Sequence, residues 1–116
     1  MIPVFIGQKP SKYKNIKTEI DGITFASKKE AKRYAELKLL ERAKQISGLK
    51  LQPRFEIIPG MRINGKLHRA IHYLADFEYI DNGVRIIEDV KGMQTDVFGI
   101  KLRLMKQVHG IEVILI

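Results

Sequence analysis

The spacing of hydrophobic and polar positions changes several times along the chain, and each change predicts a new element. Residues 17–25 are typical of two short strands around Asp21-Gly22, a dipeptide that favours tight hairpin turns. Ser27 is followed three residues later by Glu30, and this capping-box pattern predicts a helix that runs to about Ile46. The apolar positions at helical spacing, which we expect to face a core, are Ala31, Ala35, Leu39, Ala43 and Ile46.

The middle of the chain is rich in β-branched and aromatic residues and predicts an antiparallel meander. Three turn signals divide it, and they are Pro59-Gly60, Asn64-Gly65 and Asp81-Asn82-Gly83. We expect the strands of this meander to cover residues 54–58, 68–80 and 84–90, with the second of them long enough to contain a bulge.

A helical period returns after the meander, beginning at Thr95 or Asp96 and stopping at Gly110. Its apolar positions are Val97, Ile100, Leu104 and Val108. Residues 111–116 predict a final apolar strand. Because this strand follows a crossover helix, we expect it to pair parallel with an earlier strand, which would make the sheet mixed.

These elements predict an α+β fold within the broad α/β class, with a central mixed sheet flanked by two helices. Their order is β-hairpin, helix, β-meander, helix, strand. A length of 116 residues suits one domain, and the chain contains no internal repeat, low-complexity segment or Pro/Gly/Ser-rich linker. We therefore expect a single domain over residues 1–116, in which residues 1–15 form a basic and loosely ordered N-terminal arm.

The chain is strongly positive, with 21 Lys and Arg against 13 Asp and Glu and a formal net charge of +8. Such an excess favours a polyanionic partner, nucleic acid first, although a surface that only keeps the protein soluble is the alternative. The absence of Cys excludes disulfides and thiolate metal sites. No apolar stretch approaches the roughly 20 residues of a membrane span, and the N-terminus lacks a signal-peptide pattern, so we expect a cytoplasmic location without a membrane partner.

Carboxylates interrupt two of the predicted strands, at Asp76 in one and at Asp89 in the next. If these strands pair as a hairpin, the two carboxylates lie near each other, and Lys91 shares a face with Asp89 because side chains alternate along a strand. Neighbouring carboxylates repel unless a cation lies between them, and Mg²⁺ prefers such oxygen ligands. The arrangement predicts metal-dependent hydrolysis of phosphodiester bonds. The alternative is an ordinary surface ion pair between Asp89 and Lys91, with Asp76 on a solvated face.

The order Asp76, short hairpin, Asp89-Val90-Lys91 resembles the signature of the PD-(D/E)XK nuclease superfamily, and Glu30 matches the Glu of its N-terminal helix. The segments Ser-Lys-Lys-Glu-Ala, Ala-Asp-Phe and Glu-Asp-Val-Lys-Gly are similar to small phage and prophage proteins related to phage endonuclease I and junction resolvases. The resemblance covers about residues 23–108. It departs from the signature in two places, because no Pro precedes Asp76 and because Asp89 stands where Glu is commoner, with a Glu adjacent.

The resemblance implies a restriction-endonuclease-like fold and an endonuclease that uses Mg²⁺, with Mn²⁺ as a substitute, in the bacterial host of a phage or prophage. The metal ligands that it implies are Asp76, Asp89 and the carbonyl of Val90. Lys91 would assist the nucleophile, and Glu30 would complete the site or bind a second ion. Glu30 is explained equally well as the capping residue of its own helix.

Basic residues on the two predicted helices supply the remaining candidates. Lys101 falls inside the apolar stripe of the second helix, where it either points toward the carboxylates as a catalytic residue or extends its ammonium group to solvent. The candidate contacts to nucleic-acid phosphates are Lys28, Lys29, Lys32, Arg33, Arg103 and Lys106. The alternative is that these residues form ordinary solvated helix faces.

The leading hypothesis is a Mg²⁺-dependent endodeoxyribonuclease, with Holliday junctions and other branched DNA among its candidate substrates; RNA stays an alternative to DNA. Cutting two strands needs two sites, which favours a homodimer. Two other functions fit the same residues. One is a catalytically inactive DNA-binding module of the same fold, and the other is a phage-encoded domain that binds another protein.

Overall fold

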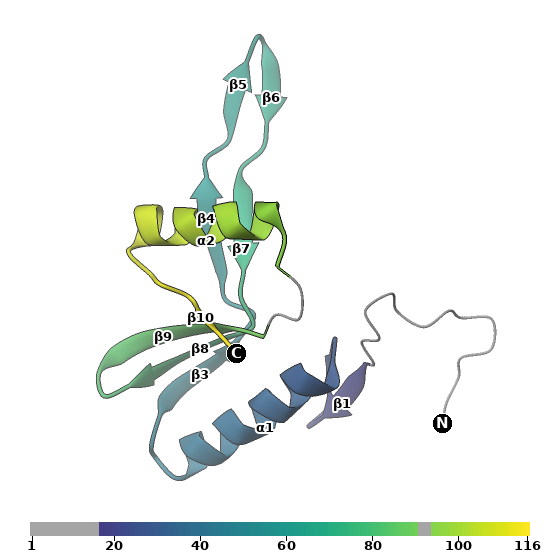
Figure 1. Cartoon of the computed structure of the whole chain (residues 1–116), viewed down its shortest axis with the longest axis vertical. Helices are drawn as coiled ribbons and strands as arrows, with labels where there is room; N and C mark the ends of the chain where they lie inside the picture. The colour runs from purple at the N-terminus through teal and green to yellow at the C-terminus, as the bar shows by residue number, and fades with distance from the viewer. Residues whose placement is uncertain (1–16, 91–93) are drawn as a thin grey trace, which may run out of the picture. The chain divides into compact units, whose positions relative to one another are not determined.

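The computed structural model describes residues 17–90 and 94–116, which form a mixed α+β fold (Figure 1). The helices are α1 (Lys28–Arg42) and α2 (Asp96–His109). The strands are β1 (Thr18–Ile20), β2 (Ile23–Phe25), β3 (Ser47–Leu51), β4 (Arg54–Ile58), β5 (Met61–Ile63), β6 (Lys66–His68), β7 (Ile71–Leu74), β8 (Phe77–Asp81), β9 (Val84–Asp89) and β10 (Ile114–Leu115). The predicted α+β class is therefore confirmed, whereas the predicted N-terminal arm lies outside the described residues. Neither α1 nor α2 is long and apolar enough to span a bilayer.

The chain divides into two compact units, Met1–Glu36 and Leu37–Ile116. In the described part of the first unit, β1 and β2 pair antiparallel around the Asp21-Gly22 turn, as the sequence predicts. The hydroxyl of Tyr34 donates to the carboxylate of Asp21 at 3.1 Å. The Ser27 hydroxyl accepts the backbone N–H of Glu30 at 3.1 Å, so the predicted N-cap of α1 is confirmed. The expectation of a single domain stays a prediction.

Helix α1 buries a different stripe from the predicted one. Leu37 is fully buried, whereas Leu39, predicted to face the core, is 63% exposed, and Ala43 is exposed as well. The buried residues of α1 are Ala31, Tyr34 and Leu37, which follow one another at intervals of three residues. The predicted stripe also begins at Ala31 but continues at intervals of four residues, so the two stripes diverge along the helix. The helix also ends at Arg42, earlier than predicted, and the left-handed Lys44 follows at a φ of 60°.

A four-stranded sheet in the order β10-β9-β8-β3 forms the centre of the second unit (Figure 1). Strand β10 pairs parallel with β9, and the other neighbours pair antiparallel, so the predicted mixed sheet is confirmed. Strand β3 is absent from the sequence prediction, which ended the helix at about Ile46 and assigned residues 47–51 to no element. Strands β8 and β9 form the predicted hairpin, whose register places Phe77 opposite Glu88 and Asp81 opposite Val84.

The long strand predicted over residues 68–80 is wrong, because the structure breaks it into β6, β7 and β8. Strands β7 and β8 are separated at Ala75 and Asp76, where β7 belongs to a ribbon with β4 and β8 belongs to the central sheet. Backbone hydrogen bonds hold this crossing point: the N–H of Ala75 donates to the carbonyl of Pro53 at 3.1 Å, and the N–H of Gln52 donates to the carbonyl of Asp76 at 2.9 Å. The chain therefore passes between the central sheet and the ribbon at two adjacent points, from β3 to β4 and from β7 to β8.

Helix α2 packs against the β4–β7 ribbon and the central sheet. The core cluster there consists of Phe55, Ile57, Tyr73, Ala75, Ile87, Phe98 and Met105. The predicted caps are confirmed, because the Thr95 hydroxyl accepts the N–H of Phe98 and Gly110 closes the helix at a φ of 70°. The predicted apolar stripe is wrong at three of its four positions: Val97, Ile100 and Val108 are exposed, Leu104 is partly buried against the core cluster, and the buried face carries Phe98 and Met105. Apolar residues lie on several sides of this helix, so periodicity alone does not identify the side that packs.

Candidate active site

Asp76 lies in the break between β7 and β8, beside the end of β9. Its backbone N–H donates to the carbonyl of Glu88 at 3.1 Å. Its carboxylate accepts the backbone N–H of Val90 at 2.7 Å, so the side chain points toward the residue that follows β9. Asp76 is half-buried and directly precedes β8, so it lies at one end of the strands.

Asp89, the last residue of β9, is only 4% exposed and is held from two sides. The hydroxyl of Tyr73 donates to its carboxylate, and the backbone N–H of Ile116 donates to its carbonyl at 3.0 Å. No Lys or Arg of residues 17–90 and 94–116 forms an ion pair with Asp89.

Tyr73 contacts the carboxylate of Asp89. Burial raises the pKa of its hydroxyl, the hydrogen bond to Asp89 raises that pKa further, and the negative charges of Asp89 and Asp76 add to the effect. The hydroxyl therefore keeps its proton and serves as a donor to Asp89. The structure thus brings Asp76 and Asp89 together at the open end of the β8–β9 hairpin.

Two other acids in the same sheet have partners of their own. Glu78 accepts two hydrogen bonds from the guanidinium of Arg85, at 3.0 and 3.1 Å. Glu88 is buried and accepts a hydrogen bond from the hydroxyl of Tyr79. Since Glu88 is paired with Phe77 in the register and bonds Tyr79, it faces the opposite side of the sheet from Asp89. Of the two adjacent acids, Asp89 is the one that shares a face with Tyr73.

The remaining predicted site residues are placed less completely. Val90 is half-buried, and its N–H reaches Asp76. Lys91 lies outside the described residues. Glu30 belongs to the first unit, so its predicted role beside the carboxylates of the second unit stays a prediction. Lys101 is half-buried on α2, three residues after the buried Phe98 and four before the buried Met105, which places it on the side of the helix that packs.

The predicted phosphate contacts fall into two groups. Lys28, Lys29, Lys32 and Arg33 lie on the part of α1 in the first unit, and Arg103 and Lys106 lie on α2. Arg33 forms an ion pair with Glu36 at 3.2 Å, and Lys106 forms one with Glu112 at 2.6 Å. The three lysines of the α1 group and Arg103 are exposed. Their contact with phosphates stays a prediction.

Tyr73 is the residue that the sequence analysis missed. In a regular strand, residues 73 and 76 point to opposite faces, so alternation separates Tyr73 from Asp76. The chain breaks at residues 75 and 76, so strand alternation does not continue from Tyr73 to Asp76, and the Tyr73 hydroxyl reaches the carboxylate of Asp89. His72, by contrast, contacts Arg54 across the ribbon at 3.3 Å and lies away from the carboxylates in the register. The available signal was a tyrosine three residues before Asp76, but its contact with Asp89 could be inferred only with knowledge of the break between β7 and β8.

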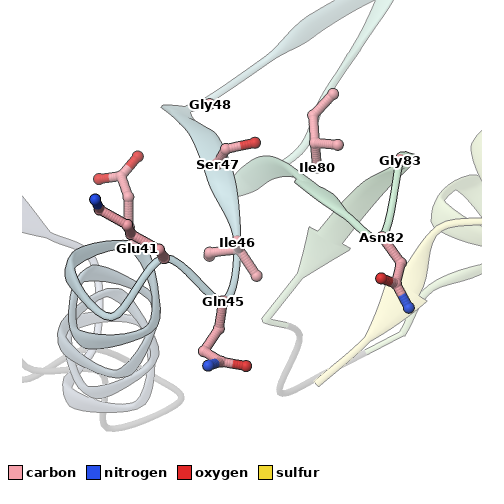
Figure 2. A pocket seen from close by; sticks show the side chains of 9 residues that line it. Glu41, Gln45, Ile46, Ser47, Gly48, Ile80, Asn82 and Gly83 are labelled. Atoms are coloured by element: carbon pink, nitrogen blue, oxygen red, sulfur yellow. The ribbon is translucent and has the colours of Figure 1, made fainter.

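A pocket of about 440 Å³ lies elsewhere in the second unit (Figure 2). It is formed at the β3 start and at the β8–β9 turn, and its lining includes Glu41, Ser47, Ile80 and Asn82. The turn is the opposite end of the hairpin from Asp89. The lining of the pocket includes neither Asp76 nor Asp89, so this pocket is separate from the candidate site. The carboxylate of Glu41 accepts the N–H of Leu49 at 3.1 Å.

We expect replacement of Tyr73 by Phe to change the dependence of stability on pH. Folded Tyr73 keeps its proton above the ordinary pKa near 10, whereas the unfolded chain releases it there, so its contribution to the free energy of unfolding is complete below about pH 10 and decreases above it. The Phe variant lacks this contribution and leaves Asp89 without its donor, which costs about 1–3 kcal/mol at pH 8. Urea unfolding in EDTA between pH 8 and 11 should show the difference between the two proteins shrinking as pH rises. Parallel curves would contradict this assignment.

Comparison with known families places the chain. Residues 10–113 match the model of a family described as a protein of unknown function, DUF1064. The chain belongs to the DUF1064 family. Searches of curated proteins and of solved structures give no match. The matched range of DUF1064 includes Asp76, Asp89 and Tyr73, so the paired carboxylates lie within the part of the chain that defines the family.

Proposed function

We propose that this DUF1064 protein is a metal-dependent endonuclease that hydrolyses phosphodiester bonds of DNA, with branched DNA such as Holliday junctions as its substrate. The observation that carries the proposal is that Asp76, whose carboxylate accepts the N–H of Val90, lies beside the end of β9, where the buried Asp89 accepts the Tyr73 hydroxyl. The resemblance to PD-(D/E)XK nucleases also supports it, because the same two acids occupy the signature positions. We place this activity in the cytoplasm of a bacterial host cell.

The donor set fits a hard divalent cation. Asp76 and Asp89 supply carboxylate oxygens, and the carbonyl of Val90 supplies a neutral oxygen, which are the ligand types that Mg²⁺ and Mn²⁺ prefer. The nearby Glu78 is neutralised by Arg85, whereas Asp89 has no such cation among the described residues. When bound, the divalent ion supplies Lewis acidity at the phosphate and lowers the pKa of water.

The residues of the chain prepare this site in distinct ways. The hydroxyl of Tyr73 donates to Asp89 and fixes the orientation of that carboxylate. The N–H of Val90 does the same for Asp76. Lys91 is assigned the role of assisting the nucleophile, by the resemblance, and Lys101 and Glu30 are assigned supporting roles at the same site. The net charge of +8 supports a DNA substrate. Cutting both strands of a duplex needs two active sites, which favours a homodimer.

The test is cleavage of DNA by the purified protein. Supercoiled plasmid and a synthetic four-way junction are incubated with the protein in Mg²⁺, in Mn²⁺ and in EDTA, and the products are resolved on gels. We expect nicked and linear products with either ion and none in EDTA. Intact DNA in both ions at an excess of protein would contradict the proposal. Salt-dependent DNA binding without cleavage would then identify an inactive binding module, and weak, salt-independent binding would identify a protein-interaction domain.

A further inference from the structure

A two-stranded hairpin extends from the core of the second unit. Strands β5 and β6 pair around Asn64-Gly65 beyond the end of the β4–β7 ribbon, and Figure 1 shows them projecting past α2. All of residues 59–69 are exposed, and Ala70 is half-buried. The hairpin therefore adds no side chain to the core cluster, and we call residues 59–70 the hairpin arm.

The hairpin arm exposes apolar side chains to solvent, which is unfavourable unless a partner covers them. Met61, Ile63 and Leu67 are 42%, 47% and 53% exposed. Strands of three residues are marginally stable when nothing packs against them. At its base the two chains approach closely, because a Cβ at Gly60 would lie 3.3 Å from the backbone nitrogen of Ala70. This construction favours a binding element that acquires its contacts from a partner.

The charge of the hairpin arm indicates the chemistry of that partner. It contains Arg62, Lys66 and Arg69 and no acidic residue, and the acid-free stretch extends over residues 57–75. None of these three cations forms an ion pair with the described residues. Arg62 donates to the carbonyl of Gly65 at 3.1 Å, which orients the guanidinium along the turn without neutralising it. A surface of this kind is complementary to a polyanion.

We propose that the hairpin arm binds in the major groove of duplex DNA. The groove is about 12 Å wide and accepts a two-stranded ribbon, whose strands lie about 4.8 Å apart before side chains are added. Arg62 and Lys66 near the turn reach phosphates or base edges, and the apolar side chains contact thymine methyl groups. The deep, narrow major groove of A-form RNA excludes such a ribbon.

The position of the hairpin arm relative to the carboxylates suits a long duplex contact; this part of the inference rests on the proposed nuclease function. Gly65 and Asp76 are eleven positions apart, and an extended chain of that length spans at most about 36 Å. One turn of B-form DNA is about 34–36 Å. The hairpin arm therefore reaches DNA up to one helical turn away from the bond that is cut.

The experiment compares two triple variants that lose the same charge. One replaces the cations of the hairpin arm (R62Q, K66Q, R69Q), and the control replaces three exposed cations of the same unit outside it (R42Q, K44Q, K50Q). Affinity for a 30-base-pair DNA duplex and for the matching double-stranded RNA is measured by fluorescence anisotropy in EDTA at several salt concentrations. No cleavage occurs under these conditions, so the outcome is independent of the proposed function. Circular dichroism verifies that each variant is folded.

We expect the hairpin-arm variant to lose at least about tenfold in affinity for DNA at 100 mM salt and to reduce the slope of log affinity against log salt by about two to three. The control should lose less than about threefold, and the hairpin-arm substitutions should change RNA binding much less than DNA binding. Equal losses in both variants, or equal effects on DNA and RNA, would overturn the inference. A second variant replaces the apolar side chains of the hairpin arm by Ser. If the wild-type protein is a dimer and this variant is a monomer with unchanged DNA affinity, the partner of the hairpin arm is a second copy of the chain, and the inference is overturned.

Discussion

Asp89→Asn is expected to slow divalent-dependent DNA cleavage by at least about a thousandfold, which corresponds to about 4 kcal/mol in the activation free energy. The amide keeps the size of the carboxylate and still accepts the hydrogen bond from Tyr73, so the fold is expected to persist. What is lost is the negative charge that would hold a divalent cation. Single-turnover cleavage of the plasmid, measured over a range of Mg²⁺ concentrations, gives the rate and the apparent metal affinity.

Glu88→Gln provides a matched control for this prediction. Glu88 is the adjacent residue, is buried and accepts a hydrogen bond from the Tyr79 hydroxyl, but it lies on the other face of β9. The Glu88→Gln variant should therefore cleave DNA at a rate within about threefold of wild type, because a carboxylate on that face does not reach the metal site. Equal losses in the two variants would show that both act through the stability of the sheet. A large loss only in Glu88→Gln would show that the acids had been assigned in the wrong order.

Leu37→Ala is expected to lower the free energy of unfolding by about 2–5 kcal/mol, whereas Leu39→Ala should change it by less than about 0.5 kcal/mol. Both substitutions remove the same atoms from the same helix. Leu37 is fully buried, so its truncation leaves a cavity, while Leu39 is mostly exposed to water. Urea unfolding of both variants, followed by circular dichroism, measures the difference. A larger loss for Leu39→Ala would restore the stripe that the sequence favours and contradict the structure.

Local signals explain which elements the sequence could predict. The Asp21-Gly22 turn, the Ser27 cap and the Thr95 and Gly110 caps each depend on a few neighbouring residues, and each is present where it was predicted. The parallel pairing of β10 also follows from a rule of connectivity, since a strand after a crossover helix returns in the same direction.

The errors come from features that depend on distant parts of the chain. Leu39 and Val97 have the spacing of core residues, but which side of an amphipathic helix is covered depends on what packs against it. The break at Asp76 depends on hydrogen bonds with Gln52 and Glu88, which are far apart in sequence. The position of Asp76 beside the end of β9 could be anticipated because one turn fixes the hairpin of β8 and β9. Tyr73 could not, because its position depends on the break.

The two bonds on Asp89 have a consequence for ligand capture. A hydroxyl from β7 holds its side chain, and the amide of Ile116 holds its main chain, so two separate elements immobilise one residue. The conformational entropy of the Asp89 side chain is therefore lost during folding and not when a ligand binds. An arriving ion would meet a preorganised oxygen donor, and the affinity of this position would depend mainly on electrostatic attraction and dehydration.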